Sequence, residues 1–376
     1  MTAKPRLAMY WAAACGGCDI AVLNLDEALV EAATHLDIVF WPAVMDVKYA
    51  DVEAMPDGSI DVTLFCGGIR NDENEHLARL LRAKSRILVA FGSCASEGCI
   101  PGLANLSTVG AILDSSFAGE TTENPDALRP LATWATAGGP IHLPTLSPLL
   151  RTLDQVVPVD YVVPGCPPET KRIAEVVGLL VAALEGTAAL PPPGSVLGGG
   201  HSTVCDECGR DRNVKRIERF VRITDLASID PALCLLEQGI PCNGPATRDG
   251  CGALCPAASA PCIGCYGAAD GVLDYGARLL SAFASVVDAS EPDAIEAILD
   301  GLPDPVGQFY RFSLASSLLH GSRAATQAAR EDASRHTEDP APATPEPDAT
   351  RPDGTGPEPA STEPEPALAA AGGPPR

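Results

Sequence analysis

Short apolar runs alternate with amphipathic stretches over about the first 190 residues of the chain. The apolar runs are four to six residues long and often β-branched, which is typical of strands buried inside a sheet. We predict strands at Arg6–Trp11, Asp37–Trp41, Val62–Cys66, Ile87–Gly92 and Tyr161–Pro164.

The stretches between these runs place apolar residues three or four positions apart, which predicts helices. In the first stretch Ala21, Leu25 and Leu29 fall on one face. We predict helices at Ile20–Ala33, Glu73–Lys84 and Pro168–Leu184. Strands that alternate with helices form βαβ units, so the pattern indicates an α/β fold with a doubly wound parallel sheet.

The pattern changes after this region. Residues 191–200 are rich in proline and glycine, which predicts a linker. Residues 201–266 show little periodicity, and helical patterning returns at Ala268–Val287 and Asp293–Leu299. Residues 325–376 are dominated by alanine, proline, glutamate and threonine. Such a segment buries too little apolar surface to offset its ordering entropy, so we predict a disordered tail.

These boundaries divide the chain into two expected domains. Its length of 376 residues agrees with about 100–200 residues per domain. We expect an α/β domain over 1–190 and, after the linker, a smaller irregular and α-helical domain over 201–324.

The chain is strongly acidic, with 26 Lys and Arg against 49 Asp and Glu and a formal net charge of −23. This balance argues against nucleic-acid binding, which needs basic side chains, and against docking on anionic lipid. No apolar run reaches the roughly 18 residues of a membrane span. The first residues also lack the apolar core of a signal peptide and a twin arginine. We therefore expect a cytoplasmic protein with no direct membrane insertion.

Fourteen cysteines are the unusual feature of the composition. Disulfides do not persist in a reducing cytoplasm, and the chain is far longer than a small disulfide scaffold. Thiols at close, repeated spacings therefore indicate metal ligation.

Four of these cysteines follow predicted strands. Cys15 and Cys18 form a C-x2-C after the first strand, Cys94 follows the fourth strand and Cys166 follows the last. Because the carboxyl ends of parallel strands share one edge of a sheet, these four thiols can meet at one point. Four sulfur ligands suit zinc or an iron–sulfur cluster.

Two more cysteines of this region are interpreted as non-ligands. Cys66 ends an apolar strand, where buried free cysteine is common, and Cys99 trails Cys94 by five residues.

Three other polar residues lie near these cysteines in the sequence. Asp19 directly follows Cys18 and is interpreted either as a carboxylate at a helix N-terminus or as part of a proton path. Glu97 is a weaker candidate for the same path. His201 is interpreted as an exposed loop residue.

Eight cysteines follow the linker, twice the number of one four-cysteine site. Prolines and glycines interleave them, which indicates a stiff, turn-rich wrap. Only the first and last pairs have two-residue spacing, so the spacing favours iron–sulfur clusters, with two zinc sites as the alternative. The eight are Cys205, Cys208, Cys234, Cys242, Cys251, Cys255, Cys262 and Cys265.

The stretch from Cys234 to Cys255, followed by Pro261-Cys262-Ile-Gly-Cys265, resembles the small subunit of nickel–iron hydrogenases. The nearest type is cytoplasmic, reduces methyl viologen and does not reduce deazaflavin. The segment Leu302–Leu314 resembles the end of these subunits.

The N-terminal motifs carry the same resemblance. Trp11–Cys18, Gly92-Ser-Cys94 and Gly165-Cys-Pro-Pro168 look like the flavodoxin-like domain of this family, to which a subunit of complex I is related. The resemblance covers about residues 5–322.

The resemblance implies three 4Fe–4S clusters in a line. The implied ligands are Cys15, Cys18, Cys94 and Cys166 for the proximal cluster, Cys205, Cys208, Cys234 and Cys242 for the distal cluster, and Cys251, Cys255, Cys262 and Cys265 for the medial cluster.

Two positions depart from the membrane-bound branch of the family. That branch has a histidine where this chain has Cys205, and a proline where this chain has Cys255, which leaves a three-iron medial cluster. A fourth thiolate lets the medial site hold a fourth iron and should lower its potential. We expect such a relay to suit a soluble, low-potential acceptor.

The reaction implied by the resemblance is H2 ⇌ 2H+ + 2e−, at a nickel–iron centre on a partner large subunit. The implied role of this chain is electron relay towards a further iron–sulfur or flavin subunit. Three alternatives stay open: the bifunctional NADP-linked hydrogenase branch, a complex-I-like electron-transfer subunit and a zinc-stabilised interaction module.

Overall fold

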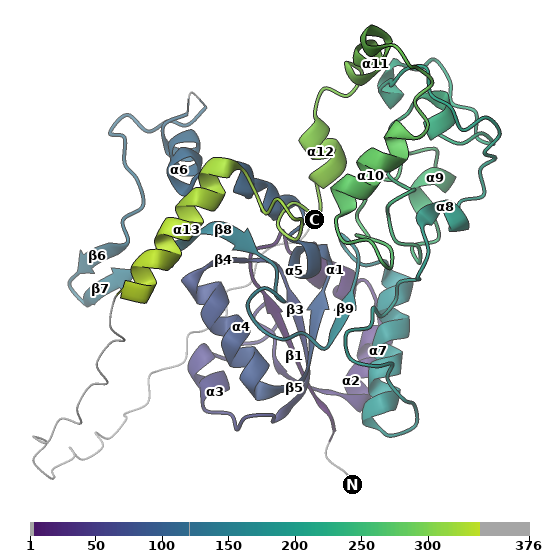
Figure 1. The fold of residues 1–376 in the computed structure, drawn as a ribbon. Helices are drawn as coiled ribbons and strands as arrows, with labels where there is room; N and C mark the ends of the chain where they lie inside the picture. Colours follow the sequence, from purple (N-terminus) through teal and green to yellow (C-terminus); the bar gives the residue numbers. More distant parts are fainter. Residues whose placement is uncertain (1–3, 120, 339–376) are drawn as a thin grey trace, which may run out of the picture. The chain divides into compact units, whose positions relative to one another are not determined.

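A parallel five-stranded sheet organises the first part of the chain in the computed structural model, which describes residues 4–119 and 121–338 (Figure 1). The strand order is β2-β1-β3-β5-β9, and every neighbouring pair is parallel. If only the strands of this sheet are counted, β5 is the fourth and β9 the fifth, and the order is 2-1-3-4-5. This is the strand order of a flavodoxin-like doubly wound fold, which confirms the predicted fold class. The strands are β1 Arg6–Trp11, β2 Asp37–Phe40, β3 Ile60–Cys66, β5 Ser85–Phe91 and β9 Tyr161–Val163.

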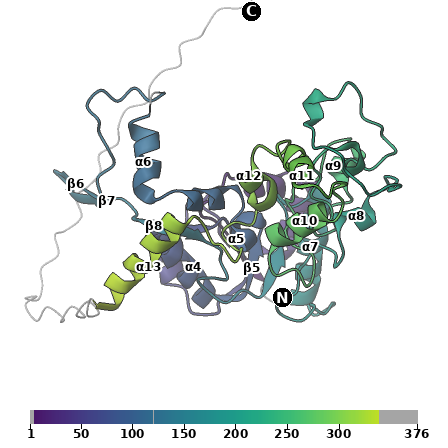
Figure 2. The same cartoon turned by 45° about the horizontal axis from the view of Figure 1, so that its top comes forward.

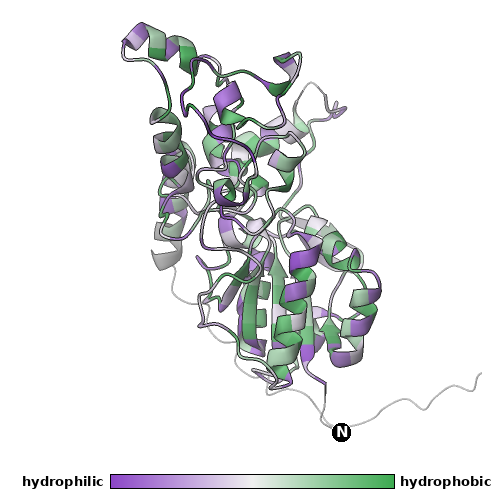
Figure 3. Cartoon of the chain, turned by 90° about the vertical axis from the view of Figure 1, so that its right-hand side faces the viewer, coloured by the Kyte–Doolittle hydropathy of each residue, from purple (hydrophilic) through white to green (hydrophobic). Residues whose placement is uncertain are grey.

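Helices cover both faces of the sheet, because successive side chains of a strand point to opposite sides. In β1, Leu7 and Met9 pack into a core with α1 and α7, whereas Ala8 and Tyr10 pack into a core with α3 and α4. Figure 3 shows the strands in the green of hydrophobic residues. The helices are α1 Gly17–Leu23, α2 Glu27–His35, α3 Tyr49–Glu53, α4 Asp72–Lys84, α5 Ser93–Glu97 and α7 Thr170–Leu184.

The predicted elements of this part agree with the structure, with one exception. β1 has the predicted bounds, and α4 and α7 each begin within two residues of the predicted start. The helix predicted at Ile20–Ala33 is instead two helices, α1 and α2. The chain breaks between them because Asp26 takes a positive φ of 50°, which no continuing helix adopts.

An excursion between β5 and β9 was not predicted from the sequence. The side chains of its hairpin are nearly all exposed, so no apolar periodicity marks it. Figures 1 and 2 show the β6–β7 hairpin at the end of a long loop that follows α6. The excursion comprises a 3-10 helix Ile100–Leu106, α6 Val109–Phe117, β6 Thr133–Thr136, β7 Gly139–His142 and β8 Leu146–Arg151, which pairs with β4 Ile69–Asn71.

A separate apolar core lies in residues 204–309. Phe283 is at its centre, with ring centroids 5.4 Å from Phe220 and 5.6 Å from Phe309. The helices around it are short and joined by long loops. They are α8 Val204–Glu207, two 3-10 helices Ile223–Asp225 and Leu236–Gln238, α9 Leu254–Ala257, α10 Tyr275–Ala284, α11 Pro292–Leu299 and α12 Pro305–Tyr310.

The segment predicted as a linker is packed against the sheet. Leu197 is buried in the core beside α7, and Val196 forms a parallel bridge with Val162 of β9. The two apolar cores are thus joined by a stretch that has fixed contacts of its own.

The start of the predicted disordered tail is helical. Helix α13 spans Arg323–Glu338, so residues 325–338 differ from the expectation. Alanine is the best helix former, and Ala325 packs in a fully buried position, which accounts for the difference. Residues 339–376 of the predicted tail lie outside the described residues. Over the described ranges, no helix is both long and apolar enough to cross a membrane.

Candidate metal centres

The first four cysteines lie at the carboxyl edge of the parallel sheet. Cys15 follows β1, Cys18 lies in α1, Cys94 lies in α5 just after β5, and Cys166 follows β9. Cys18 and Cys94 are buried, Cys166 is half-buried and Cys15 is exposed. The parallel topology thus brings thiols from three separate loops to one edge.

Glycine at position 92 lets the backbone pass close to one of these sulfurs. A Cβ at Gly92 would lie 2.5 Å from the Sγ of Cys18, and the residue has a φ of +82°. Gly244 likewise lies close to a sulfur of the distal set, since a Cβ at this position would lie 3.1 Å from the Sγ of Cys205. Only glycine leaves this space beside the sulfurs.

Cys99 and Cys66, which were interpreted as non-ligands, both contact this set. The Sγ of Cys99 lies 3.3 Å from the Sγ of Cys166, and Cys99 also contacts Cys94. Cys66 is fully buried and contacts Cys18. The hydrogen bond from Cys99 lowers the pKa of Cys166 to about 7, which favours its thiolate.

The cysteines assigned to the distal cluster line one cavity. Cys205, Cys208, Cys234 and Cys242 all face it, together with Arg212. Burial, reinforced by the neighbouring thiols, raises the pKa of Cys205 to about 12, so this thiol is protonated until a cation displaces the proton.

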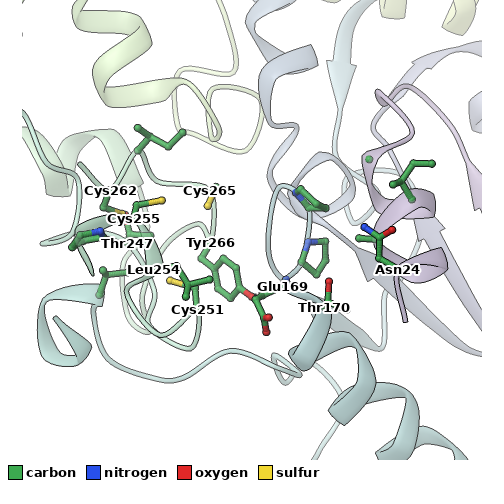
Figure 4. A pocket seen from close by; sticks show the side chains of 18 residues that line it. Asn24, Glu169, Thr170, Thr247, Cys251, Leu254, Cys255, Cys262, Cys265 and Tyr266 are labelled. Atoms are coloured by element: carbon green, nitrogen blue, oxygen red, sulfur yellow. Dashed lines mark hydrogen bonds between the residues drawn. The ribbon is translucent and has the colours of Figure 1, made fainter. Parts of the chain in front are cut away.

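The cysteines assigned to the medial cluster line a second cavity, of about 460 Å³. Figure 4 shows Cys251, Cys255, Cys262 and Cys265 on one side of it, with Tyr266 beside them. Burial raises the pKa of Cys265 to about 12. Each of the two C-terminal sets predicted from the sequence therefore shares a cavity.

Backbone amides donate hydrogen bonds to several sulfurs. The N–H of Gly17 donates to Cys15 Sγ at 3.4 Å, and the N–H of Cys262 donates to Cys242 Sγ at 3.3 Å. Such bonds favour a thiolate and tune the potential of a bound iron–sulfur centre. These N–H donors therefore stabilise the negative charge that the sulfurs carry after they lose their protons.

The distances between the cysteines distinguish a site for a single metal ion from a site for a cluster. Within residues 4–119 and 121–338, no three His, Cys, Asp or Glu side chains lie where they could hold one metal ion. In a 4Fe–4S cluster each thiolate binds a different iron, so its four sulfurs lie further apart than the ligands of one ion. The shared cavities, the glycine clearance and the amide donors fit such a cluster.

Asp19 is buried beside the first set, with 4% of its surface exposed. Its Oδ1 accepts a hydrogen bond from Trp41 Nε1 at 2.7 Å, and its Oδ2 has no hydrogen-bond partner. Burial raises the pKa of Asp19, although the bond from Trp41 opposes this shift. The carboxyl can therefore hold a proton on Oδ2.

Glu97 ends α5, three residues after Cys94, and contacts the loop that follows Cys265. It accepts a hydrogen bond from the N–H of Ala268 at 3.2 Å, and burial raises the pKa of Glu97 to about 7. His201 is 86% exposed and pairs with Asp270, as expected for a loop residue.

Residues 15–180 match the family described as NADH ubiquinone oxidoreductase, 20 Kd subunit. The iron–sulfur subunit of the F420-non-reducing hydrogenase of Archaeoglobus profundus is 39% identical to this chain, over 84% of it and 98% of that protein. The chain belongs to the family of F420-non-reducing hydrogenase iron–sulfur subunits. The corresponding vhu hydrogenase subunit of Methanocaldococcus jannaschii is 37% identical over 85% of this chain and 98% of that protein.

Membership of this family makes the chain a subunit of a hydrogenase, an oxidoreductase acting on H2. A chain in a structure of an NAD+-reducing NiFe hydrogenase in the H2-reduced state is 29% identical to it. That similarity covers 50% of this chain and 96% of that chain, with a TM-score of 0.42.

The contacts of Cys99 could not be found from sequence spacing. Cys99 is part of no short cysteine motif, and its partner Cys166 is 67 residues away. Only the parallel pairing of β5 and β9 brings the two loops together. The sequence analysis used that signal for the cysteine directly after each strand, Cys94 and Cys166, and not for Cys99.

Proposed function

We propose that this chain is the electron-transfer small subunit of a nickel–iron hydrogenase. It relays electrons between the active site of a large subunit and a soluble acceptor. The observation that carries the proposal is that two sets of four cysteines each line a cavity of their own, while a third set lies at the sheet edge. Three complete sets of four thiols match the ligands of three 4Fe–4S clusters.

The proposal assigns a role to twelve cysteines. When bound, a 4Fe–4S cluster supplies one-electron oxidation and reduction. The chain fixes the sulfurs, buries several of them and directs backbone N–H groups at some of them. The proposed ligand sets are Cys15, Cys18, Cys94 and Cys166 (proximal), Cys251, Cys255, Cys262 and Cys265 (medial), and Cys205, Cys208, Cys234 and Cys242 (distal).

Contacts between the sets support this order. Ser93, next to Cys94, donates a hydrogen bond to the carbonyl of Cys265 at 2.5 Å. The N–H of Cys262 then donates to Cys242 Sγ. The chain therefore links the first set to the set of Cys262 and Cys265, and that set to the one containing Cys242.

Two cysteines adapt the proposed relay to a low-potential acceptor. Cys255 gives the medial cavity its fourth thiol, and Cys205 gives the distal cavity its fourth. Added thiolate charge disfavours reduction of the site and lowers its potential.

The range of the sequence matches favours a hydrogenase over a complex-I-like subunit. The match to the 20 Kd subunit family ends at residue 180, before all eight C-terminal cysteines. The match to the Archaeoglobus profundus protein extends over 321 residues and 98% of that protein.

The proposal includes partners and a location. A large subunit supplies the nickel–iron centre, and a further iron–sulfur or flavin subunit accepts the electrons. We propose a cytoplasmic complex, in keeping with a chain whose many cysteines serve as ligands in a reducing compartment.

Anaerobic purification of the complex from its native host tests this function. We expect the large subunit to copurify and the complex to reduce methyl viologen in the presence of H2. A complex without H2-dependent viologen reduction, or with zinc in place of iron, would contradict the proposal.

A pair of variants ties that activity to the ligand sets. Cys255→Ser removes one of the four medial thiols and should reduce the iron content of the complex and slow viologen reduction. Cys66→Ser changes a buried cysteine outside the twelve and should leave the iron content unchanged.

A further inference from the structure

Basic residues gather in one segment of this acidic chain. Residues 210–222 contain six of the 26 Lys and Arg residues but only two of the 49 Asp and Glu residues. The segment therefore has a local charge of +4 within a chain of net charge −23. The basic residues are Arg210, Arg212, Lys215, Arg216, Arg219 and Arg222.

Part of this segment lines a cavity of about 410 Å³ that also reaches the distal cysteines. Arg212, Lys215 and Arg216 line it together with Arg278 of α10, and all four are exposed. The cavity wall also includes Cys205, Cys234 and Cys242. We call this feature the basic cavity.

The acidic residues at the basic cavity already have partners. Glu237 accepts hydrogen bonds from the N–H groups of Asn213, Val214 and Lys215 at 2.7–3.1 Å. Asp206 accepts from the N–H of Thr203 at 3.0 Å and from nearby hydroxyls.

The basic side chains keep most of their charge available. Arg216 pairs with Asp288 at 2.9 Å. Over the described residues, Lys215 and Arg278 take part in no ion pair. The basic cavity is therefore net positive beside the distal cysteines.

We propose that the basic cavity is the docking surface for an acidic face of the electron-acceptor protein. This inference rests on the proposed function, because it takes the distal set as the end of the relay. The acidic rest of the chain would repel an acidic acceptor. A positive surface at the distal cysteines would instead guide the acceptor to the end of the relay, where the distance for electron transfer is short.

The backbone favours a protein partner over a small phosphate ligand. Phosphate sites commonly use several successive backbone N–H groups. At the basic cavity three such groups, from Asn213 to Lys215, already bind the carboxylate of Glu237. The positive charge of the basic cavity comes from long, exposed Arg and Lys side chains, which can form ion pairs with a broad acidic protein surface.

A charge-reversal experiment on the intact hydrogenase complex tests the docking surface. The double variant Lys215→Glu with Arg278→Glu reverses two of the cavity charges. The control Lys171→Glu with Arg323→Glu makes the same change in total charge at exposed side chains outside the basic segment that do not line the cavity. The probes are an acidic 2Fe–2S ferredoxin and methyl viologen, both reduced with H2.

We expect the cavity variant to lower kcat/KM for the ferredoxin at least tenfold at low salt, with a smaller effect at high salt. Its reduction of methyl viologen and its iron content stay unchanged, and the control variant behaves like the wild type. Equal ferredoxin kinetics for the two double variants would overturn the inference. Failure of the wild type to reduce viologen would instead contradict the proposed function.

Discussion

The thiol of Cys99 lies 3.3 Å from the sulfur of Cys166, although the two residues are 67 positions apart. Cys166 is one of the four proposed proximal ligands, and Cys99 donates a hydrogen bond to it. Cys99 is buried, so its donor has no competing water. The contact makes Cys99 a positioning residue for the proximal set.

Replacement of Cys99 by alanine removes this hydrogen bond. We expect Cys99→Ala to keep its iron, because four ligands remain. A hydrogen bond of about 1 kcal/mol corresponds to roughly 40 mV for one electron, so the proximal potential should fall by about that amount. Potentiometric EPR measures the shift. A loss of four irons, as expected for Cys166→Ala, would show instead that Cys99 is a ligand.

Substitution of Gly92 should damage the proximal set. In Gly92→Ala the new Cβ would lie 2.5 Å from Cys18 Sγ and would sit at a φ of +82°. We expect loss of the proximal iron and of H2-dependent viologen reduction.

Gly178 in α7 provides the control for Gly92. A Cβ at Gly178 would meet nothing within 4 Å. Gly178→Ala should therefore keep all its iron and stabilise the helix by up to about 1 kcal/mol in thermal unfolding. Full iron content in Gly92→Ala would contradict this prediction, because it would show that Cys18 can move and still bind iron.

Glu97 should make the stability of the chain depend on pH. Burial raises the pKa of Glu97 to about 7, whereas the unfolded chain has a value near 4.3. Between these values the folded state binds more protons than the unfolded state, so the free energy of unfolding falls as the pH rises. This loss of stability is fully present above pH 7 and amounts to about 4 kcal/mol at most.

Glu97→Gln removes this titration. We expect the variant to gain thermal stability relative to the wild type as the pH rises from about 5 to about 8. Parallel stability curves for the two proteins would show that Glu97 does not titrate in this range.

Asp19 offers a test of proton transfer near the proximal set. Its Oδ2 has no hydrogen-bond partner, and burial raises its pKa. We expect Asp19→Asn to slow H2 turnover and to alter its pH profile while the iron content stays the same. If turnover and its pH profile stay unchanged, Asp19 takes no part in proton transfer and has only a structural role at the start of α1.

The sequence predicted the sheet and its edge well, because buried parallel strands such as β1 and β5 are short, apolar runs. It missed the break between α1 and α2, since Ala21, Leu25 and Leu29 keep helical spacing across it. It also missed β6 and β7, whose exposed side chains carry no apolar signal. These elements depend on tertiary contacts and turn geometry rather than on periodicity.

The candidate sites divide in the same way. Strand ends were enough to group the first four cysteines, whereas the division of the other eight into two sets came from the family resemblance; each of those two sets lines a cavity in the structure. The contacts of Cys99 and Cys66 depend on the packing of separate loops, and so does the basic cavity, which joins Arg278 of α10 to a distant loop.

The central claim is that twelve cysteines hold three 4Fe–4S clusters. The most direct measurement is the iron, acid-labile sulfide and zinc content of this subunit, from the complex purified anaerobically. The account predicts about twelve irons and twelve sulfides per chain, with no zinc. One or two equivalents of zinc, or only four irons per chain, would contradict it.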